Sequence, residues 1–302
     1  MNENKTKTWL YVIITVIVSA VAVVFQTILN NYYIEAETGL YEYGAQTPSA
    51  FYIFMGVALF LTVTASFVLR CDSLPKELNY SSIFTSLVST LVACSLIFLA
   101  VVYIMSNSGG ATLLEKTAAF KLKNVCMYLS FPTAIYYFIV AFSGSSRSKF
   151  TAWFSFFPII WTLSYLMSVY FDHSVLMNSP KRTLTEFALI ILMLYQLYET
   201  RALIGKSKGV LYFILSNAAV IFLSAAFIPD VITFIKGDIR LSVDVLSSIS
   251  IASMGLYVLS RAMSFAVHSD GEQVANKKSL KKWVAPGASA KDGLFEPEED
   301  QD

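Results

Sequence analysis

The sequence predicts an all-α membrane protein, a polytopic bundle of about eight transmembrane helices. Of its 302 residues, 56% are hydrophobic and only 14% are charged, whereas soluble domains usually contain about 25% charged residues. Several apolar runs exceed the roughly 18 residues that mark a membrane-spanning helix. These runs are continuous and do not alternate with polar residues, which excludes a transmembrane β-barrel.

The predicted spans follow one another with polar loops between them. The first span begins directly after a charged N-terminus, as in a signal peptide. Its apolar part is too long for a signal peptide, however, and no convincing cleavage site follows, so we interpret it as an uncleaved anchor. Two interpretations of the seventh span are open: it continues through Pro229, or Pro229 breaks it and leaves residues 231–235 as a short turn at the membrane surface. The eight spans are residues 9–29, 51–69, 82–105, 124–142, 151–171, 183–201, 209–235 and 242–265.

The distribution of basic residues predicts that both termini are cytoplasmic. Most of the 22 Lys and Arg residues fall on the side of the N-terminus, and cytoplasmic loops are the ones enriched in these residues. The first loop on the other side, residues 30–50, contains three glutamates and no basic residue. The predicted topology is therefore N-in and C-in.

The chain divides into a transmembrane domain, residues 1–267, and a cytoplasmic tail, residues 268–302. The tail begins with the basic stretch "ANKKSLKKWVAPG" and ends with the acidic "KDGLFEPEEDQD", and we expect it to be disordered because it is poor in apolar groups. Two interpretations of the basic stretch are open. Its lysines contact anionic lipid headgroups, or they only fix the topology as a positive flank. These lysines are Lys277, Lys278, Lys281 and Lys282.

The sixth predicted span carries a glutamate near each end, Glu186 and Glu199. Thirteen helical positions place them about 20 Å apart, too far for a carboxylate pair that exchanges protons. Thr183 and Glu186 have the spacing of a helix-capping box, which predicts a structural role for Glu186.

Glu199 lies beside Arg201 near the inner end of this span, which predicts a charge-paired helix end. Arg261, near the inner end of the last span, is the expected partner of Glu199. The alternative is that the Arg261 guanidinium reaches out to the lipid headgroups.

Acids also cluster at the outer ends of the last three spans. Asp230 and Asp244 fall at the level of Glu186, and ionisable groups at membrane depth point to function. The three acids are a candidate outer vestibule that attracts cations. The competing hypothesis is that Asp230 and Asp244 cap helix ends and pair with the nearby Lys236 and Arg240.

Small polar residues recur at helical spacing in three spans. Such stripes let membrane helices approach closely and hydrogen-bond, or they line an aqueous pathway, and both interpretations are open. The stripes contain Thr15, Ser19 and Gln26 in the first span, Ser86 and Ser89 in the third, and Asn217 and Ser224 in the seventh. Aromatic residues near the predicted membrane surfaces are typical of an interfacial belt; they are Trp9, Tyr11, Tyr32, Tyr33, Tyr103, Tyr165 and Tyr170.

No pattern for cofactor binding or catalysis occurs. The three cysteines fall in or beside different spans without a CxxC pair, and the chain has two histidines, so we expect no metal or other cofactor. Nucleotide-binding, zinc-protease and serine-hydrolase motifs do not occur. A net charge of +1 gives no indication of nucleic-acid binding.

One segment resembles known sequences. Residues 177–205, "MNSPKRTLTEFALIILMLYQLYETRALIG", are similar to a segment of uncharacterised multi-span membrane proteins of anaerobic Gram-positive bacteria. The similarity includes Asn178-Ser179-Pro180 before the span and Leu197-Tyr198-Glu199 with Arg201 at its end. The resemblance implies a bacterial plasma membrane and brings no known activity.

These observations favour a non-enzymatic protein that binds or transports a small solute or ion without ATP. A sensor or membrane-complex subunit that signals through the tail is the alternative. A lipid-modifying enzyme is disfavoured because no catalytic residues are recognised.

Overall fold

The computed structural model describes residues 3–34, 40–41, 46–68, 82–107, 117–143, 149–173, 176–177, 179–204, 209–237 and 241–287. These residues form helices, apart from turns and one isolated bridge between Ile34 and Tyr41. The helices are α1 (Glu3–Tyr32), α2 (Thr47–Val68), α3 (Ile83–Asn107), α4 (Ala118–Ser143), α5 (Lys149–Phe154), α6 (Phe156–Tyr170), α7 (Pro180–Leu203), α8 (Gly209–Ile235) and α9 (Val243–Gly287).

Seven helical segments are long and apolar enough to cross a membrane, as the sequence predicts. They are Trp9–Tyr32, Thr47–Phe67, Ile83–Ser106, Ala118–Phe142, Phe150–Tyr170, Gly209–Ile235 and Val243–Ser264. The outer surfaces of these helices carry large apolar side chains such as Ile53, Phe60 and Leu87, each more than 60% exposed. Apolar surface of this extent fits contact with lipid tails rather than water.

α7 is the eighth helix of the bundle and runs through its full depth despite its charged residues. At its beginning, Arg182 donates hydrogen bonds to the backbone oxygens of Tyr170 and Asp172 at the end of α6. At its end, the Thr200 hydroxyl donates to the backbone oxygen of Ser155, just before α6 begins. α7 is therefore antiparallel to α6 along its whole length, in agreement with the predicted span at 183–201.

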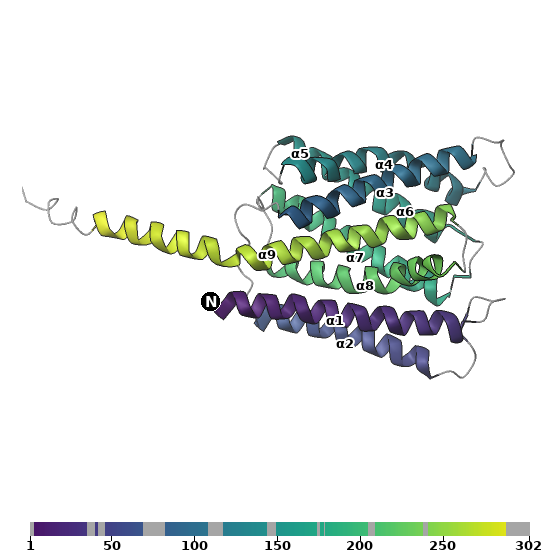
Figure 1. Ribbon diagram of the computed structural model, residues 1–302, viewed down its shortest axis with the longest axis horizontal. Helices are drawn as coiled ribbons and strands as arrows, with labels where there is room; N and C mark the ends of the chain where they lie inside the picture. The colour runs from purple at the N-terminus through teal and green to yellow at the C-terminus, as the bar shows by residue number, and fades with distance from the viewer. Residues whose placement is uncertain are drawn as a thin grey trace, which may run out of the picture.

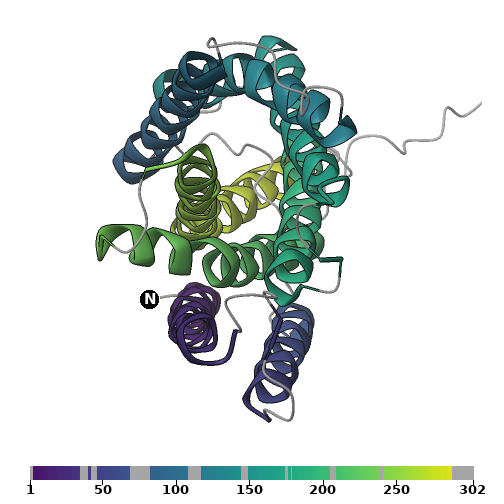
Figure 2. The same cartoon turned by 90° about the vertical axis from the view of Figure 1, so that its right-hand side faces the viewer.

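Six helices form a closed ring. Along the chain, α3 packs against α4, α4 against α6, α6 against α7, α7 against α8 and α8 against α9, and α9 closes the ring against α3 (Figure 2). α1 and α2 lie outside this ring, with α1 against α8 and α9. α8 and α9 approach closely at Gly255, where an added Cβ would lie 3.3 Å from Leu223 Cβ.

The seventh predicted span is one continuous helix, so of the two interpretations that the sequence left open, the unbroken one is correct. α8 runs from Gly209 to Ile235 with Pro229 inside it. A proline removes one backbone donor from a helix, which neighbouring helices and Ser or Thr side chains compensate in a membrane bundle. One turn further on, the Thr233 hydroxyl donates to the Pro229 backbone oxygen at 2.8 Å, which is a contact within the helix and does not replace the missing donor.

The last helix extends beyond the bundle through residues 268–287, and the expectation that the tail is disordered stays a prediction. α9 continues to Gly287 over 45 residues, about 67 Å at the helical rise, and projects away from the ring on the side of the N-terminus (Figure 1). Residues 268–285 contain no proline, so nothing in the backbone chemistry ends the helix there. The acidic residues 291–302 lie outside the described residues.

Candidate functional site

A buried ion pair joins α7 and α9 near the inner end of the ring. The Nε of Arg261 lies 3.2 Å from Oε1 of Glu199, and their side chains are only 2% and 4% exposed. The pair is the one that the sequence suggested, and the guanidinium does not reach the headgroups. The Nε–H itself has no hydrogen-bond partner, so its contact with the carboxylate is an electrostatic one.

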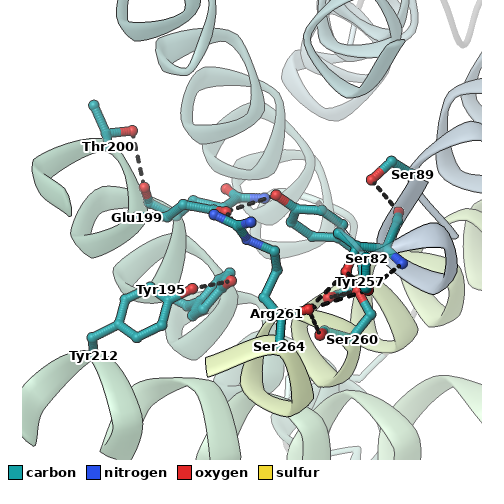
Figure 3. A network of polar contacts seen from close by, with 12 residues as sticks. Ser82, Ser89, Tyr195, Glu199, Thr200, Tyr212, Tyr257, Ser260, Arg261 and Ser264 are labelled. Atoms are coloured by element: carbon teal, nitrogen blue, oxygen red, sulfur yellow. Dashed lines mark hydrogen bonds and ion pairs between the residues drawn. The ribbon is translucent and has the colours of Figure 1, made fainter. Parts of the chain in front are cut away.

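Tyrosines surround this pair. Tyr257, one helical turn before Arg261, donates a hydrogen bond of 2.6 Å to Glu199 Oε1. Tyr195, one turn before Glu199, lies with its hydroxyl 3.1 Å from that of Tyr212 on α8. Figure 3 shows these side chains converging from α7, α8 and α9. All three tyrosines are at most 1% exposed.

The charged and aromatic side chains span the interior of the ring. Within the described residues, the α9 backbone packs against α1, α3 and α8 but not against α4 or α7. Tyr257 on α9 nevertheless reaches Glu199 on α7, and its ring meets that of Tyr137 on α4 edge-on at 5.1 Å. Side chains therefore fill the space that the ring of helices encloses.

The same interior continues away from Glu199 as a polar and aromatic layer. Thr162 on α6 donates a 2.9 Å hydrogen bond to Gln196. The Trp161 indole donates to the Ser130 hydroxyl at 2.8 Å and stacks on Tyr165 with 5.6 Å between ring centroids. All five side chains are buried, with exposed fractions of at most 9%.

We use the term interior column for two groups of side chains together: those around the Glu199–Arg261 pair, and those of the polar and aromatic layer beside it. Both groups lie in the interior of the ring. The interior column consists of Ser130, Tyr137, Trp161, Thr162, Tyr165, Tyr195, Gln196, Glu199, Tyr212, Tyr257 and Arg261.

Hydroxyl groups join α9 to α3 one turn beyond Arg261. The Ser264 hydroxyl lies 3.0 Å from that of Thr85 and 3.3 Å from that of Ser82, as Figure 3 shows in part. Because membrane helices associate through hydrogen bonds and close packing, these contacts fix α9 against α3 at the level where it leaves the bundle.

The outer acids are paired, but not with the partners that we expected. Asp230 pairs with Lys181 of α7 at 2.7 Å and accepts a hydrogen bond from Ser248 of α9. Asp244 pairs with Lys123 of α4 at 2.8 Å and is 80% exposed.

The capping hypothesis for Asp230 and Asp244 therefore named the wrong partners, because the ion pairs join different helices. Lys236 is exposed at the end of α8, and Arg240 lies outside the described residues. Each acid of the expected vestibule has its own cation.

Glu186 does not cap its helix. α7 begins at Pro180 with Ser179 at the N-cap position that the capping-box pattern assigns to Thr183, and Glu186 instead accepts from Arg182 at 2.9 Å. Arg201, expected beside Glu199, lies over the ring of Tyr198 at 5.2 Å.

The polar stripes hold helices together. Thr15 on α1 donates to the Asn217 side chain on α8 at 2.9 Å, and Ser86 on α3 donates to the Ala141 backbone oxygen on α4 at 2.9 Å. The other stripe residues bond within their own helix: Ser19 to Thr15, Gln26 to Asn30, Ser89 to Thr85, and Ser224 to Val220. Of the two interpretations of the stripes, these contacts favour close packing and hydrogen bonding of the helices over the lining of an aqueous pathway.

Two apolar grooves open on the outside of the ring. One, of about 380 Å³, lies between α1, α8 and α9 and includes Ser19, Ser224 and Gly255. The other, of about 340 Å³, lies between α1 and α2 and includes Thr15 and Thr62. Both are separate from the interior column.

No metal-binding group of three or more His, Cys, Asp or Glu occurs in the part of the chain that the structure describes. Cys126 is a buried free thiol and Cys94 an exposed one, and Cys71 falls outside the described residues. The side chains of the four tail lysines, Lys277, Lys278, Lys281 and Lys282, are also outside the described part. Comparison with protein-family models, curated proteins and solved structures gave no match.

The tyrosines of the interior column are what the sequence analysis missed. Three residues of the expected aromatic belt, Tyr11, Tyr103 and Tyr165, are in fact buried in the bundle, where Tyr11 donates to the Thr62 backbone oxygen and Tyr103 to Asn124. The available signal was spacing: Tyr195 precedes Glu199, and Tyr257 precedes Arg261, by one helical turn. Residues four positions apart share a helix face.

Proposed function

We propose that the protein binds a small polar solute or ion inside the helix ring and moves it across the membrane without ATP. The observation that carries this proposal is the buried Glu199–Arg261 pair with three tyrosine hydroxyls around it. Charged residues inside a membrane bundle are expensive to bury and typically belong to solute or ion pathways. A bundle that needed only mechanical stability could fill the same space with apolar side chains.

The arrangement of the polar side chains supports a path along the ring interior. At the outer end, Asp230 and Ser248 connect α8 and α9. Toward the inner end, Thr162, Gln196, Tyr257 and Glu199 follow. These groups could exchange hydrogen bonds with a polar solute at several levels of the interior, which lowers the cost of burying it in the bilayer.

The cellular setting is part of the proposal. The resemblance of residues 177–205 supports a bacterial plasma membrane, and the concentration of Lys and Arg on one side supports cytoplasmic termini. The N-terminus and the projecting end of α9 lie on the same side of the bundle (Figure 1), which fits this orientation.

Flux measurements in proteoliposomes test the function. The purified protein is reconstituted and challenged with gradients of sodium, methylammonium, acetate and glycine. We expect at least one probe to move faster than through empty vesicles, and we expect Glu199→Gln and Tyr257→Phe to slow it. Lys123→Gln, which alters an ion pair outside the interior column, is the matched control. Equal flux in Glu199→Gln and wild type would exclude the interior column as the path.

A membrane subunit that signals through α9 is the second candidate. The observation in its favour is the continuity of α9 from inside the ring to Gly287, because a continuous helix transmits a displacement of the bundle to its free end. Contact of the tail lysines with anionic lipids belongs to this proposal.

Fluorescence from a dye attached at Ser279Cys tests the second candidate in nanodiscs. We expect the emission to differ between anionic and zwitterionic lipids, and replacement of the four lysines by glutamine to remove the difference. Identical emission in both lipids would contradict lipid contact.

A further inference from the structure

We propose that the site at Glu199 and Arg261 selects a small zwitterion, a solute with one carboxylate and one ammonium group of the size of a simple amino acid. This inference rests on the proposed function and specifies its substrate class. It follows from the charge balance of the site, from the geometry of the ion pair and from the side chains that surround it.

The site is electrically neutral and closed to water. Glu199 and Arg261 are 4% and 2% exposed and face each other at 3.2 Å, and Figure 3 shows the guanidinium beside the carboxylate with Tyr195, Tyr212 and Tyr257 around them. Each charge is therefore compensated almost entirely by the other.

Neutrality restricts what can enter. A solute with a single charge would pair with one partner and leave the other charged group buried alone, which weakens binding by about 100- to 1,000-fold. A zwitterion avoids this penalty because its carboxylate can face Arg261 while its ammonium group faces Glu199. One ion pair is then exchanged for two, and no charge is left without a partner.

The geometry of the pair favours such an exchange. Oε1 of Glu199 contacts Arg261 and also accepts the Tyr257 hydrogen bond, while the Arg261 Nε–H lacks hydrogen-bond alignment. An incoming carboxylate could offer the Nε–H the aligned hydrogen bond that it does not make with Glu199. The pair thus has less to lose on separation than it would if this N–H were already hydrogen-bonded.

The surrounding side chains limit the size of the solute. Tyr195, Tyr212 and Tyr257 are at most 1% exposed, and the Tyr137 ring closes the site from α4. The faces of these rings attract an ammonium group. Because these side chains pack closely around the pair, we expect a solute that enters the site to be short, which argues against peptides and lipids.

Binding of three probes of similar size tests the inference. Glycine carries both charges, methylammonium only the positive one and acetate only the negative one. Affinities are measured by calorimetry on the full chain in nanodiscs. We expect glycine to bind wild-type protein at least 100-fold more tightly than either singly charged probe.

Two variants should change the preference in opposite directions. Arg261→Gln leaves Glu199 alone, so methylammonium should become the preferred probe. Glu199→Gln leaves Arg261 alone, so acetate should become preferred. The double variant Lys123→Gln, Asp244→Asn removes an exposed pair elsewhere and should retain the preference for glycine.

The outcomes separate the inference from the proposed function. If acetate or methylammonium binds wild type as tightly as glycine, the zwitterion inference is overturned and solute binding stands. If glycine binds both single variants as it binds wild type, the site lies elsewhere and both are overturned. If glycine does not bind wild type, the inference is overturned and the flux experiment decides the function. The wild-type comparison decides the inference even where a variant does not fold.

Discussion

At the scale of single residues, the Glu199–Arg261 pair sets the energetics of the bundle interior. Each partner is buried where water cannot solvate it, so each depends on the other for compensation of its charge. Tyr257 adds a hydrogen bond to the carboxylate. The pair as a whole contributes little to the free energy of unfolding, but the loss of one member is strongly destabilising.

Removing one charge should therefore destabilise the protein more than removing both. We expect Glu199→Gln to lower the free energy of unfolding by about 3–5 kcal/mol, because Arg261 is left buried without its counter-ion. The double variant Glu199→Gln, Arg261→Met should lose clearly less. Unfolding of the detergent-solubilised protein measures both, and a double variant less stable than the single one would contradict the argument. Lys123→Gln, in an exposed pair, should change the value by less than about 1 kcal/mol.

Loss of the Tyr257 hydroxyl should have a smaller effect. Tyr257→Phe removes a hydrogen bond to a charged acceptor and should lower the free energy of unfolding by about 1.5–3 kcal/mol. Tyr128, whose ring faces outward and is 64% exposed, supplies the control Tyr128→Phe. An equal effect of both variants would mean that the Tyr257 hydroxyl contributes nothing specific.

The sequence indicated the ion pair but not the tyrosines around it. Ionisable residues are rare in membrane spans, so Glu199 and Arg261 were identifiable, and their common level near the inner surface suggested the pairing. Tyrosine is common at membrane surfaces and in cores alike, so its type does not reveal its location. Which face of α9 points into the ring depends on the packing of α3 and α8 against it, and that is a property of the tertiary structure.

At the scale of the elements, the long apolar runs predicted the helices well because length and composition alone suffice for them. The sequence did not decide the outcome where local rules compete with packing. Pro229 disrupts an isolated helix, yet α8 continues through it, with Pro229 buried in the bundle. The capping box expected at Thr183 and Glu186 does not form either, because α7 begins earlier, at Pro180.

The contact between α8 and α9 should depend on the absence of a side chain at Gly255. An added Cβ would lie 3.3 Å from Leu223 Cβ, closer than ordinary contact, and Leu223 is fully buried and cannot move away. Alanine favours the helix by about 1 kcal/mol, but overpacking costs about 1–3 kcal/mol, so we expect Gly255→Ala to destabilise by about 1 kcal/mol.

Gly56 provides the matched control for this prediction. It is also in a helix, but an added Cβ there meets nothing within 4 Å. Gly56→Ala should leave the unfolding midpoint unchanged or raise it, since only the gain in helix propensity remains. Equal destabilisation by both variants would show that the glycine at 255 is not a packing requirement.

At the scale of the whole molecule, the ring of six helices explains how a protein with few charged residues can hold an ion pair in its interior. α3, α4, α6, α7, α8 and α9 enclose the interior column from all sides, so the charges are shielded from lipid although they are remote from water. α1 and α2 lie outside the ring and contribute only apolar grooves and hydroxyl contacts. The order of the helices around the ring could not be read from the sequence, because every span is apolar enough to pack against any other.

The position of α7 determines the topology of the entire chain. α7 is the least apolar helix of the bundle, but its two ends contact opposite ends of α6, so we expect it to cross the membrane. With eight crossings both termini should lie on one side, and from the excess of Lys and Arg we expect that side to be the cytoplasm. Reporter fusions after residues 40 and 175 should then be external, and fusions after residues 206 and 290 should be cytoplasmic.

The fusions after residues 175 and 206 decide whether α7 crosses the membrane. If both report the same side, α7 does not cross and the termini lie on opposite sides. If all four fusions report the side opposite to the expected one, the eight crossings are confirmed and only the predicted orientation is wrong.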